Sequence, residues 1–264
     1  MVVDFDPFSL TGPAEVPLAR APLVRVIAQV RFPPVASLGR ADFMAPFQEE
    51  LRRRYPILTP QRTAGFMLGP QGVVLQNSDG IVWRFRDKPA AWHVSLGTDF
   101  VALEATSYSD RDDFMTRLEE VLRALEKTAE PAIYVRLGLR YINRVTGAEF
   151  AQLSDLLRAE VLGLSASSIP GLTHSICESR FTKGDTALAT RWGRLPAGAT
   201  TDPAALEPVG EPSWVLDLDM FRAAQKDFDV KALADDTRDF ARTIHDFFRW
   251  CVTPKFLEVY GGKS

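Results

Sequence analysis

The chain has 264 residues, of which 46% are hydrophobic, 10% aromatic and 25% charged, and this globular composition excludes fibrous, coiled-coil and wholly disordered classes. The 31 Lys and Arg side chains against 34 Asp and Glu give a net charge of −3, so the chain as a whole is not a polycation. Residues 1–6 lack the basic and apolar blocks of a signal peptide, no apolar run could cross a bilayer, and two cysteines fit a reducing compartment. We therefore predict a cytoplasmic protein.

The first half of the chain predicts a strand, a helix, further strands and a second helix. Residues 1–22 hold four prolines without periodicity and are expected to form an arm on the surface. Asp79-Gly80 is typical of a two-residue hairpin turn and predicts strands on either side of it. Alternation and helical periodicity predict strands at 24–32, 73–78, 81–86, 92–96 and 100–108, and helices at 43–55 and 111–127.

The same order of elements then begins again. The patterns predict strands at 134–145, 172–181, 186–194 and 213–221, helices at 149–162 and 233–252, and a proline- and alanine-rich loop at 197–212. Val24-Arg25-Val26-Ile27 parallels Val135-Arg136-Leu137-Gly138, and Trp92 parallels Trp214. We interpret this as an internal duplication. The alternative is that two runs of similar elements match by chance.

These elements predict an α+β fold with two β-α-β(3-4)-α halves. The halves would form a mostly antiparallel sheet with helices packed on one face, because alternating strands have one apolar face to cover. The predicted organisation is an N-terminal arm at 1–22, a first repeat at 23–132 and a second repeat at 133–264. The other face of the sheet would be open and polar.

Seven arginines fall on this open face by strand alternation. Guanidinium groups on a wide polar sheet could bind phosphates or an acidic segment of a partner. The alternative is that they form cross-strand pairs with neighbouring acids on a solvent-exposed face and bind nothing. The candidate binding residues are Arg25, Arg31, Arg84, Arg86, Arg136, Arg140 and Arg144.

Three stretches resemble a sporadically distributed bacterial family of uncharacterised conserved proteins. They are residues 22–32, residues 100–108 and, most specifically, Arg136-Leu137-Gly138-Leu139-Arg140-Tyr141-Ile142-Asn143-Arg144. The likeness covers nearly the whole chain and implies an accessory role rather than a place in core metabolism. The family has no assigned catalytic residues, so the resemblance implies no active site.

The sequence lacks the common catalytic motifs. Residues 163–167 lack the second glycine of a serine nucleophile elbow, and the three histidines are too scattered for a zinc site. Cys251 lies on an apolar helix, where a structural thiol is commoner than a nucleophile. The best enzymatic hint is Asp217-Leu218-Asp219, whose two carboxylates project to one side of a strand, with Glu178 on a neighbouring strand, as a two-metal phosphoryl-transfer site requires.

The sequence therefore favours a non-enzymatic accessory module of bacterial origin. It would hold a partner protein or a nucleic acid on the arginine-bearing sheet, without a cofactor. The alternatives are a metal-dependent phosphoryl-transfer enzyme using Asp217 and Asp219, and a structural subunit of a homodimer.

Overall fold

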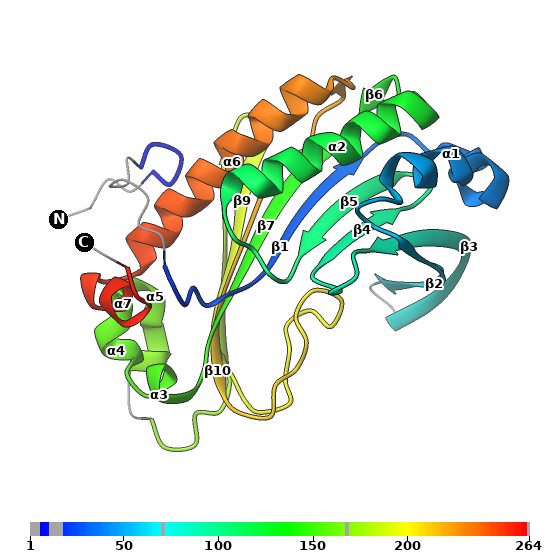
Figure 1. Cartoon of the computed structure of the whole chain (residues 1–264). Coiled ribbons are helices and arrows are strands. Elements are labelled where there is room, and N and C mark those ends of the chain that lie inside the picture. The colour runs from blue at the N-terminus through cyan, green and yellow to red at the C-terminus, as the bar shows by residue number, and fades with distance from the viewer. Residues whose placement is uncertain (1–5, 11–17, 70–71, 167–168, 263–264) are drawn as a thin grey trace. The chain divides into compact units, whose positions relative to one another are not determined.

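The chain has an α+β fold in which nine strands form a large antiparallel sheet (Figure 1). The structure is a computed structural model that describes residues 6–10, 18–69, 72–166 and 169–262, with backbone only for residues 62–69 and 72–79. The strand order is β2-β3-β4-β5-β1-β7-β10-β9-β8, and β6 and β11 form a separate two-stranded sheet. The strands are β1 Leu23–Arg31, β2 Ile57–Gly69, β3 Gly72–Arg86, β4 Trp92–Leu96, β5 Phe100–Ala105, β6 Ile133–Tyr134, β7 Arg136–Val145, β8 Ser175–Lys183, β9 Thr186–Leu195, β10 Ser213–Arg222 and β11 Lys226–Asp227.

In the part of the chain that the structure describes, three helices have more than two turns and the others are short. The longer helices are α1 Ala41–Leu51, α2 Arg111–Ala129 and α6 Val230–Cys251; the short ones are α3 Gly147–Phe150, α4 Leu153–Leu156, α5 Ala159–Leu162 and α7 Pro254–Val259, with 3₁₀ turns at Ala36–Gly39 and Gly163–Ala166. None of the helices in the described residues is both long and apolar enough to cross a membrane.

The chain divides into two compact units. Unit 1 comprises residues 1–26, 139–222 and 238–264, and unit 2 comprises residues 27–138 and 223–237. Each unit contains segments that are far apart in the sequence.

In unit 2, helices α1 and α2 cover the apolar face of β3, β4 and β5. Asp110 caps the start of α2, because its carboxylate accepts a hydrogen bond from the Asp113 amide at 2.8 Å. The ring of Phe114 packs on Trp92 at 5.8 Å, and Phe47 of α1 meets Phe85 edge to face at 5.6 Å. Each such fully buried side chain contributes about 1.5–3 kcal/mol to the free energy of unfolding.

In unit 1, the C-terminal part of α6 covers the apolar face of β8, β9 and β10. Phe247 lies 5.9 Å from the ring of Phe181 on β8, and Trp214 and Leu218 on β10 are buried. These contacts with α6 all lie on the apolar face, and the polar side chains of the strands lie on the opposite face. We call the polar side of the strands in each unit its open face.

The structure corrects two local predictions and adds two elements. The pattern at 149–162 forms three short helices, because Leu157 pairs with Val252 and the Arg158 amide donates to the Cys251 carbonyl. Asp79-Gly80 is not a turn: β3 runs through it, and Gly80 pairs with Thr63 of β2. Strand β2 and helix α7 were not predicted.

The strand order bears on the duplication without proving it. In the first half of the chain β5, the last strand, neighbours β1, and in the second half β10 neighbours β7 in the same way. Trp92 on β4 and Trp214 on β10, however, occupy non-equivalent places in this order. The internal duplication therefore stays a prediction.

Candidate binding site

The open face of unit 1 carries a row of charged side chains across three neighbouring strands. Asp217 of β10 lies opposite Arg191 of β9, and Arg191 lies opposite Glu178 of β8. Because side chains alternate along a strand, all three project away from the face that α6 covers. Arg191 Nε donates to Glu178 Oε1 at 2.6 Å, so the charges of these two side chains neutralise each other.

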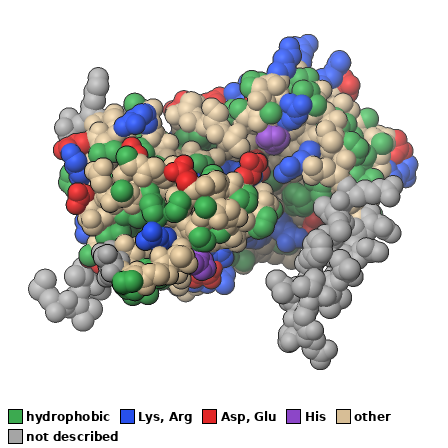
Figure 2. Space-filling view, turned by 90° about the horizontal axis from the view of Figure 1, so that it is seen from below, with side chains coloured by type: hydrophobic (Ala, Val, Ile, Leu, Met, Phe, Trp, Pro, Cys, Tyr) green, Lys and Arg blue, Asp and Glu red, His purple; other side chains and the backbone are tan. Residues whose placement is uncertain are grey.

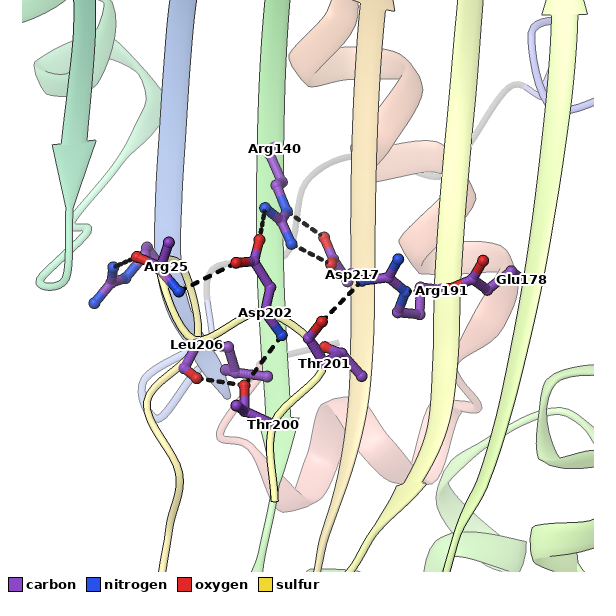
Figure 3. Close-up of polar contacts among 10 residues, drawn as sticks. Arg25, Arg140, Glu178, Arg191, Thr200, Thr201, Asp202, Leu206 and Asp217 are labelled. Atoms are coloured by element: carbon purple, nitrogen blue, oxygen red, sulfur yellow. Dashed lines mark hydrogen bonds and ion pairs between the residues drawn. The ribbon is translucent and has the colours of Figure 1, made fainter. Parts of the chain in front are cut away.

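Arg140 of β7 binds the carboxylate of Asp217 in a bidentate manner, through two hydrogen bonds (Figure 3). Its Nε donates to Oδ1 at 2.8 Å and its Nη2 to Oδ2 at 2.7 Å. The side chain of Asp217 is only 7% exposed, whereas that of Arg140 is 20% exposed. Burial acts to lower the pKa of Arg140, but Asp217 and then Asp202 together raise it above its ordinary value. The guanidinium therefore stays charged, as a buried carboxylate requires.

The loop between β9 and β10, residues 196–212, folds over part of this face and is held by the same arginine. Arg140 Nη1 donates to Asp202 Oδ2 at 2.7 Å. Burial acts to raise the pKa of Asp202, but the hydrogen bond and charge of Arg140 and the amides of Ala204 and Ala205 lower it. Thr200 ties the loop further, since its hydroxyl donates to the Leu206 carbonyl at 2.5 Å.

Two more arginines reach the loop from the sheet (Figure 3). Arg25 Nη1 donates to the Ala204 carbonyl at 3.2 Å, and its Nη2 lies 3.9 Å from Glu207 Oε1. Arg191 Nη1 reaches the Thr201 carbonyl at 3.5 Å. These contacts order the proline- and alanine-rich loop, and they show that the open face of unit 1 is partly covered.

Beside the loop, the face is hollowed to a volume of about 500 Å³. We call this cavity the open-face hollow. Arg180 of β8 extends over the ring of Phe221 of β10, with its guanidinium carbon 5.0 Å from the ring centre, and makes no ion pair with a described residue. The hollow is lined by Arg140, Glu178, Ser179, Arg180, Ala189, Thr190, Arg191, Asp202, Asp217, Asp219 and Phe221.

The charges around the hollow are of both signs and mostly paired. Figure 2 shows the same mixture at the surface, where basic and acidic side chains are interspersed rather than gathered in one basic block. A long polyanion needs several free cations along its path. The hollow instead offers one arginine–aromatic contact among neutralised pairs.

Of the seven predicted arginines, the structure brings Arg25 and Arg140 to the loop beside the hollow, but neither is free. The Nε and Nη2 atoms of Arg144 are buried, and neither has a hydrogen-bond partner among the described residues. Burial lowers the pKa of Arg144, and the charge of Glu207 opposes this only in part.

The other four predicted arginines belong to unit 2. Arg31 forms a close ion pair with Asp99. The guanidinium of Arg136 lies over Gly138, where a Cβ would come within 2.5 Å of Nη1. Arg84 and Arg86 have no ion-pair or hydrogen-bond partner among the side chains that the structure describes.

Arg180, Arg191, Asp202 and Phe221 were not among the predicted site residues. Alternation within 175–183 and 213–222 could have assigned Arg180 and Phe221 to the open face, since the half-buried Phe181 and the buried Leu218 mark the other one. No sequence pattern could place Asp202, because it reaches Arg140 from an irregular loop.

A metal ion at Asp217, as the phosphoryl-transfer alternative requires, would compete with Arg140. Asp217 has both carboxylate oxygens engaged by Arg140, so a cation there would have to displace a guanidinium. In the part of the chain that the structure describes, no three His, Cys, Asp or Glu side chains are grouped to hold a metal ion. Cys251 is buried, which raises the pKa of its thiol, whereas Cys177 is exposed.

No protein-family model matches the chain, and no curated protein matches it significantly.

Proposed function

We propose that this protein is a non-enzymatic binding module that receives a segment of a partner protein in the open-face hollow of unit 1. The observation that carries the proposal is Arg180, an exposed arginine stacked on Phe221 in a cavity whose other charges are mostly paired. An arginine over an aromatic ring offers a cationic donor and an apolar surface together, a combination enriched at protein–protein contacts.

The contacts around the hollow support binding rather than catalysis. Arg140 binds Asp217 and Arg191 binds Glu178, so two of the three acids that a phosphoryl-transfer site would use are already paired with arginines. Paired charges also keep the cavity rigid, since each side chain is fixed by its partner before a ligand arrives.

A protein segment fits this surface better than a nucleic acid. A phosphate backbone entering the hollow would meet Asp219 and Asp202 as well as Arg180. A polypeptide can place donors, acceptors and apolar groups individually, and therefore suits a lining of mixed sign. The resemblance of residues 136–144 to a bacterial accessory family, which is itself a proposal, agrees with such a role.

The test is site-specific photo-crosslinking in the producing cell. Phe221 is replaced by its benzophenone derivative, which keeps an aromatic ring in the hollow, and the same derivative at Phe43 of α1 serves as the control. We expect a crosslinked protein at position 221 that is missing at position 43. The purified candidate should then bind wild-type protein and bind Arg180→Glu about tenfold more weakly.

Three results would overturn the proposal. They are identical crosslinks at both positions, a candidate whose affinity does not depend on Arg180, and a crosslink to nucleic acid. A self-crosslink at position 221, with a dimer in sedimentation, would instead favour the homodimer alternative. Stabilisation by Mg²⁺ or Mn²⁺ that disappears in Asp217→Asn/Asp219→Asn would favour the metal-dependent enzyme.

A further inference from the structure

The open face of unit 2 carries two arginines that have no counter-charge among the described residues. Arg84 and Arg86 lie two residues apart on β3, so they share a face, while Trp83 and Phe85, on either side of Arg84, are buried on the other. Neither arginine makes an ion pair or hydrogen bond with a described residue. Among the described residues of this unit, Arg31 and Arg117 by contrast are paired with acids.

Strand β4, which pairs with β3, gives these arginines polar neighbours. Ser95 of β4 lies opposite Arg84, and His93 lies opposite Arg86. His93 in turn lies opposite Glu104 of β5, with His93 Nδ1 and Glu104 Oε1 4.0 Å apart. On β4 the residues directly opposite the two arginines are therefore a serine and a histidine, and the acid Glu104 lies one strand further away, opposite His93.

An apolar area adjoins the arginines at the Val82 end of the strand. Val82 shares their face, and Phe100 of β5 lies over Gly97, where a Cβ would come within 2.4 Å of the ring. Leu96 pairs with both Trp83 and Val101, which places Gly97 and Phe100 at the Val82 end. Along β3 the open face thus presents Val82, Arg84 and Arg86 at every second residue, an apolar side chain followed by two basic ones.

We propose that this face binds an extended acidic segment of a partner protein with the pattern apolar-x-acid-x-acid. Side chains on one face of an extended peptide recur about every 6.6–6.8 Å, which is also the spacing of Val82, Arg84 and Arg86 along β3. A peptide lying along β3 places its apolar side chain on Val82 and Phe100 and one carboxylate on each guanidinium. Each guanidinium can hold a carboxylate through two hydrogen bonds.

The neighbouring acids favour a peptide over a nucleic acid here. Glu104 lies on β5 opposite His93, and Asp99 lies in the turn just before Phe100, so a phosphate backbone crossing the face would be repelled by both carboxylates. An extended peptide carries its charges only where its sequence puts them. The inference rests on the proposed function only in that the ligand is a protein segment, because the surface belongs to the other unit.

The test uses fluorescence anisotropy of a labelled peptide, Gly-Leu-Thr-Glu-Thr-Glu-Gly, at low salt. The control peptide, Gly-Leu-Thr-Thr-Glu-Glu-Gly, has the same composition, but its adjacent acids point to opposite sides when extended. We expect the first peptide to bind the wild-type protein at least fivefold more tightly than the second. Arg84→Gln and Arg86→Gln should each weaken binding about fivefold, and the double variant by more than tenfold.

A matched variant controls for net charge. Arg123→Gln/Arg242→Gln also removes two positive charges, from exposed sites on α2 and α6, and should leave the affinity within twofold of wild type. The thermal midpoint of every variant is measured to confirm that it is folded.

Four results would overturn this inference. They are no binding of the first peptide at 1 mM, equal binding of both peptides, equal losses in the two double variants, and tighter Arg84-dependent binding of an oligothymidylate. None of them bears on the crosslink at Phe221, so the two proposals fail separately.

Discussion

The buried pair between Arg140 and Asp217 gives the sharpest stability prediction. Arg140→Met removes both hydrogen bonds of a carboxylate that is 7% exposed, and also one hydrogen bond of Asp202. Removing one partner of a buried ion pair costs about 3–5 kcal/mol, because the other charge is left without compensation. Since Arg140 keeps some contact with solvent, we take the lower end, about 3 kcal/mol, or a fall in the thermal midpoint of about 6–9 °C.

The double variant separates the pair from simple loss of packing. Arg140→Met/Asp217→Leu replaces both charges by apolar groups and should be more stable than Arg140→Met alone by at least about 1.5 kcal/mol. Arg242→Met, which breaks an exposed helical pair with Asp239, should change stability by less than about 0.5 kcal/mol. Thermal and urea unfolding followed by circular dichroism measure all three. A loss below about 1 kcal/mol in Arg140→Met, or a double variant less stable than the single, would refute the argument.

Four further predictions concern the loop, the thiols and the sheet edge. The pKa of Asp202 is lowered from its ordinary 3.8, so the contribution of this carboxylate to the free energy of unfolding is complete above that value. This contribution is lost as the pH falls through the folded-state pKa. In acid titrations the stability difference between wild type and Asp202→Asn should therefore shrink below about pH 4. Arg140→Met should release the 196–212 loop, so that thermolysin, which cleaves before apolar residues, cuts the Ala205–Leu206 bond faster than in wild type; equal rates would contradict the anchoring role of Arg140. A maleimide should modify Cys177 but not the buried Cys251 in the folded protein, giving one adduct by mass spectrometry and two after denaturation. Gly193→Ala should lower the thermal midpoint by several degrees, since φ is +144° there and a Cβ would lie 1.9 Å from the Ser175 carbonyl oxygen; an unchanged midpoint would show that the β8–β9 pairing adapts.

Much of the fold was predictable because many elements bury one regular stripe. Helix α2 and strands β4 and β5 show clean periodicity, and the structure has them at nearly the predicted residues. Strand β2 was missed because Ile57-Leu58 is followed by polar residues and Pro60, which do not alternate. The Asp79-Gly80 prediction was wrong because a local turn propensity was overridden by pairing with β2 along the strand.

The candidate site was only partly predictable, for a related reason. Alternation placed Arg140 and Asp217 on polar faces, but the chemistry of each depends on which charges meet across strands and from the loop. Arg25 and Arg140 are engaged by Ala204, Asp202 and Asp217, contacts that span between 62 and 179 residues of sequence. Sequence patterns find charged residues on a face, whereas only the fold decides which of them remain unpaired.

The measurement that most directly tests a partner site in unit 1 is backbone hydrogen exchange with and without the protein captured at position 221. Binding in the open-face hollow should slow exchange in β8 and in β9 near Arg180 and Ala189, and leave α2 unchanged, because only groups covered by the partner are shielded. Protection confined to helices, or none in β8 at saturating partner, would contradict the account.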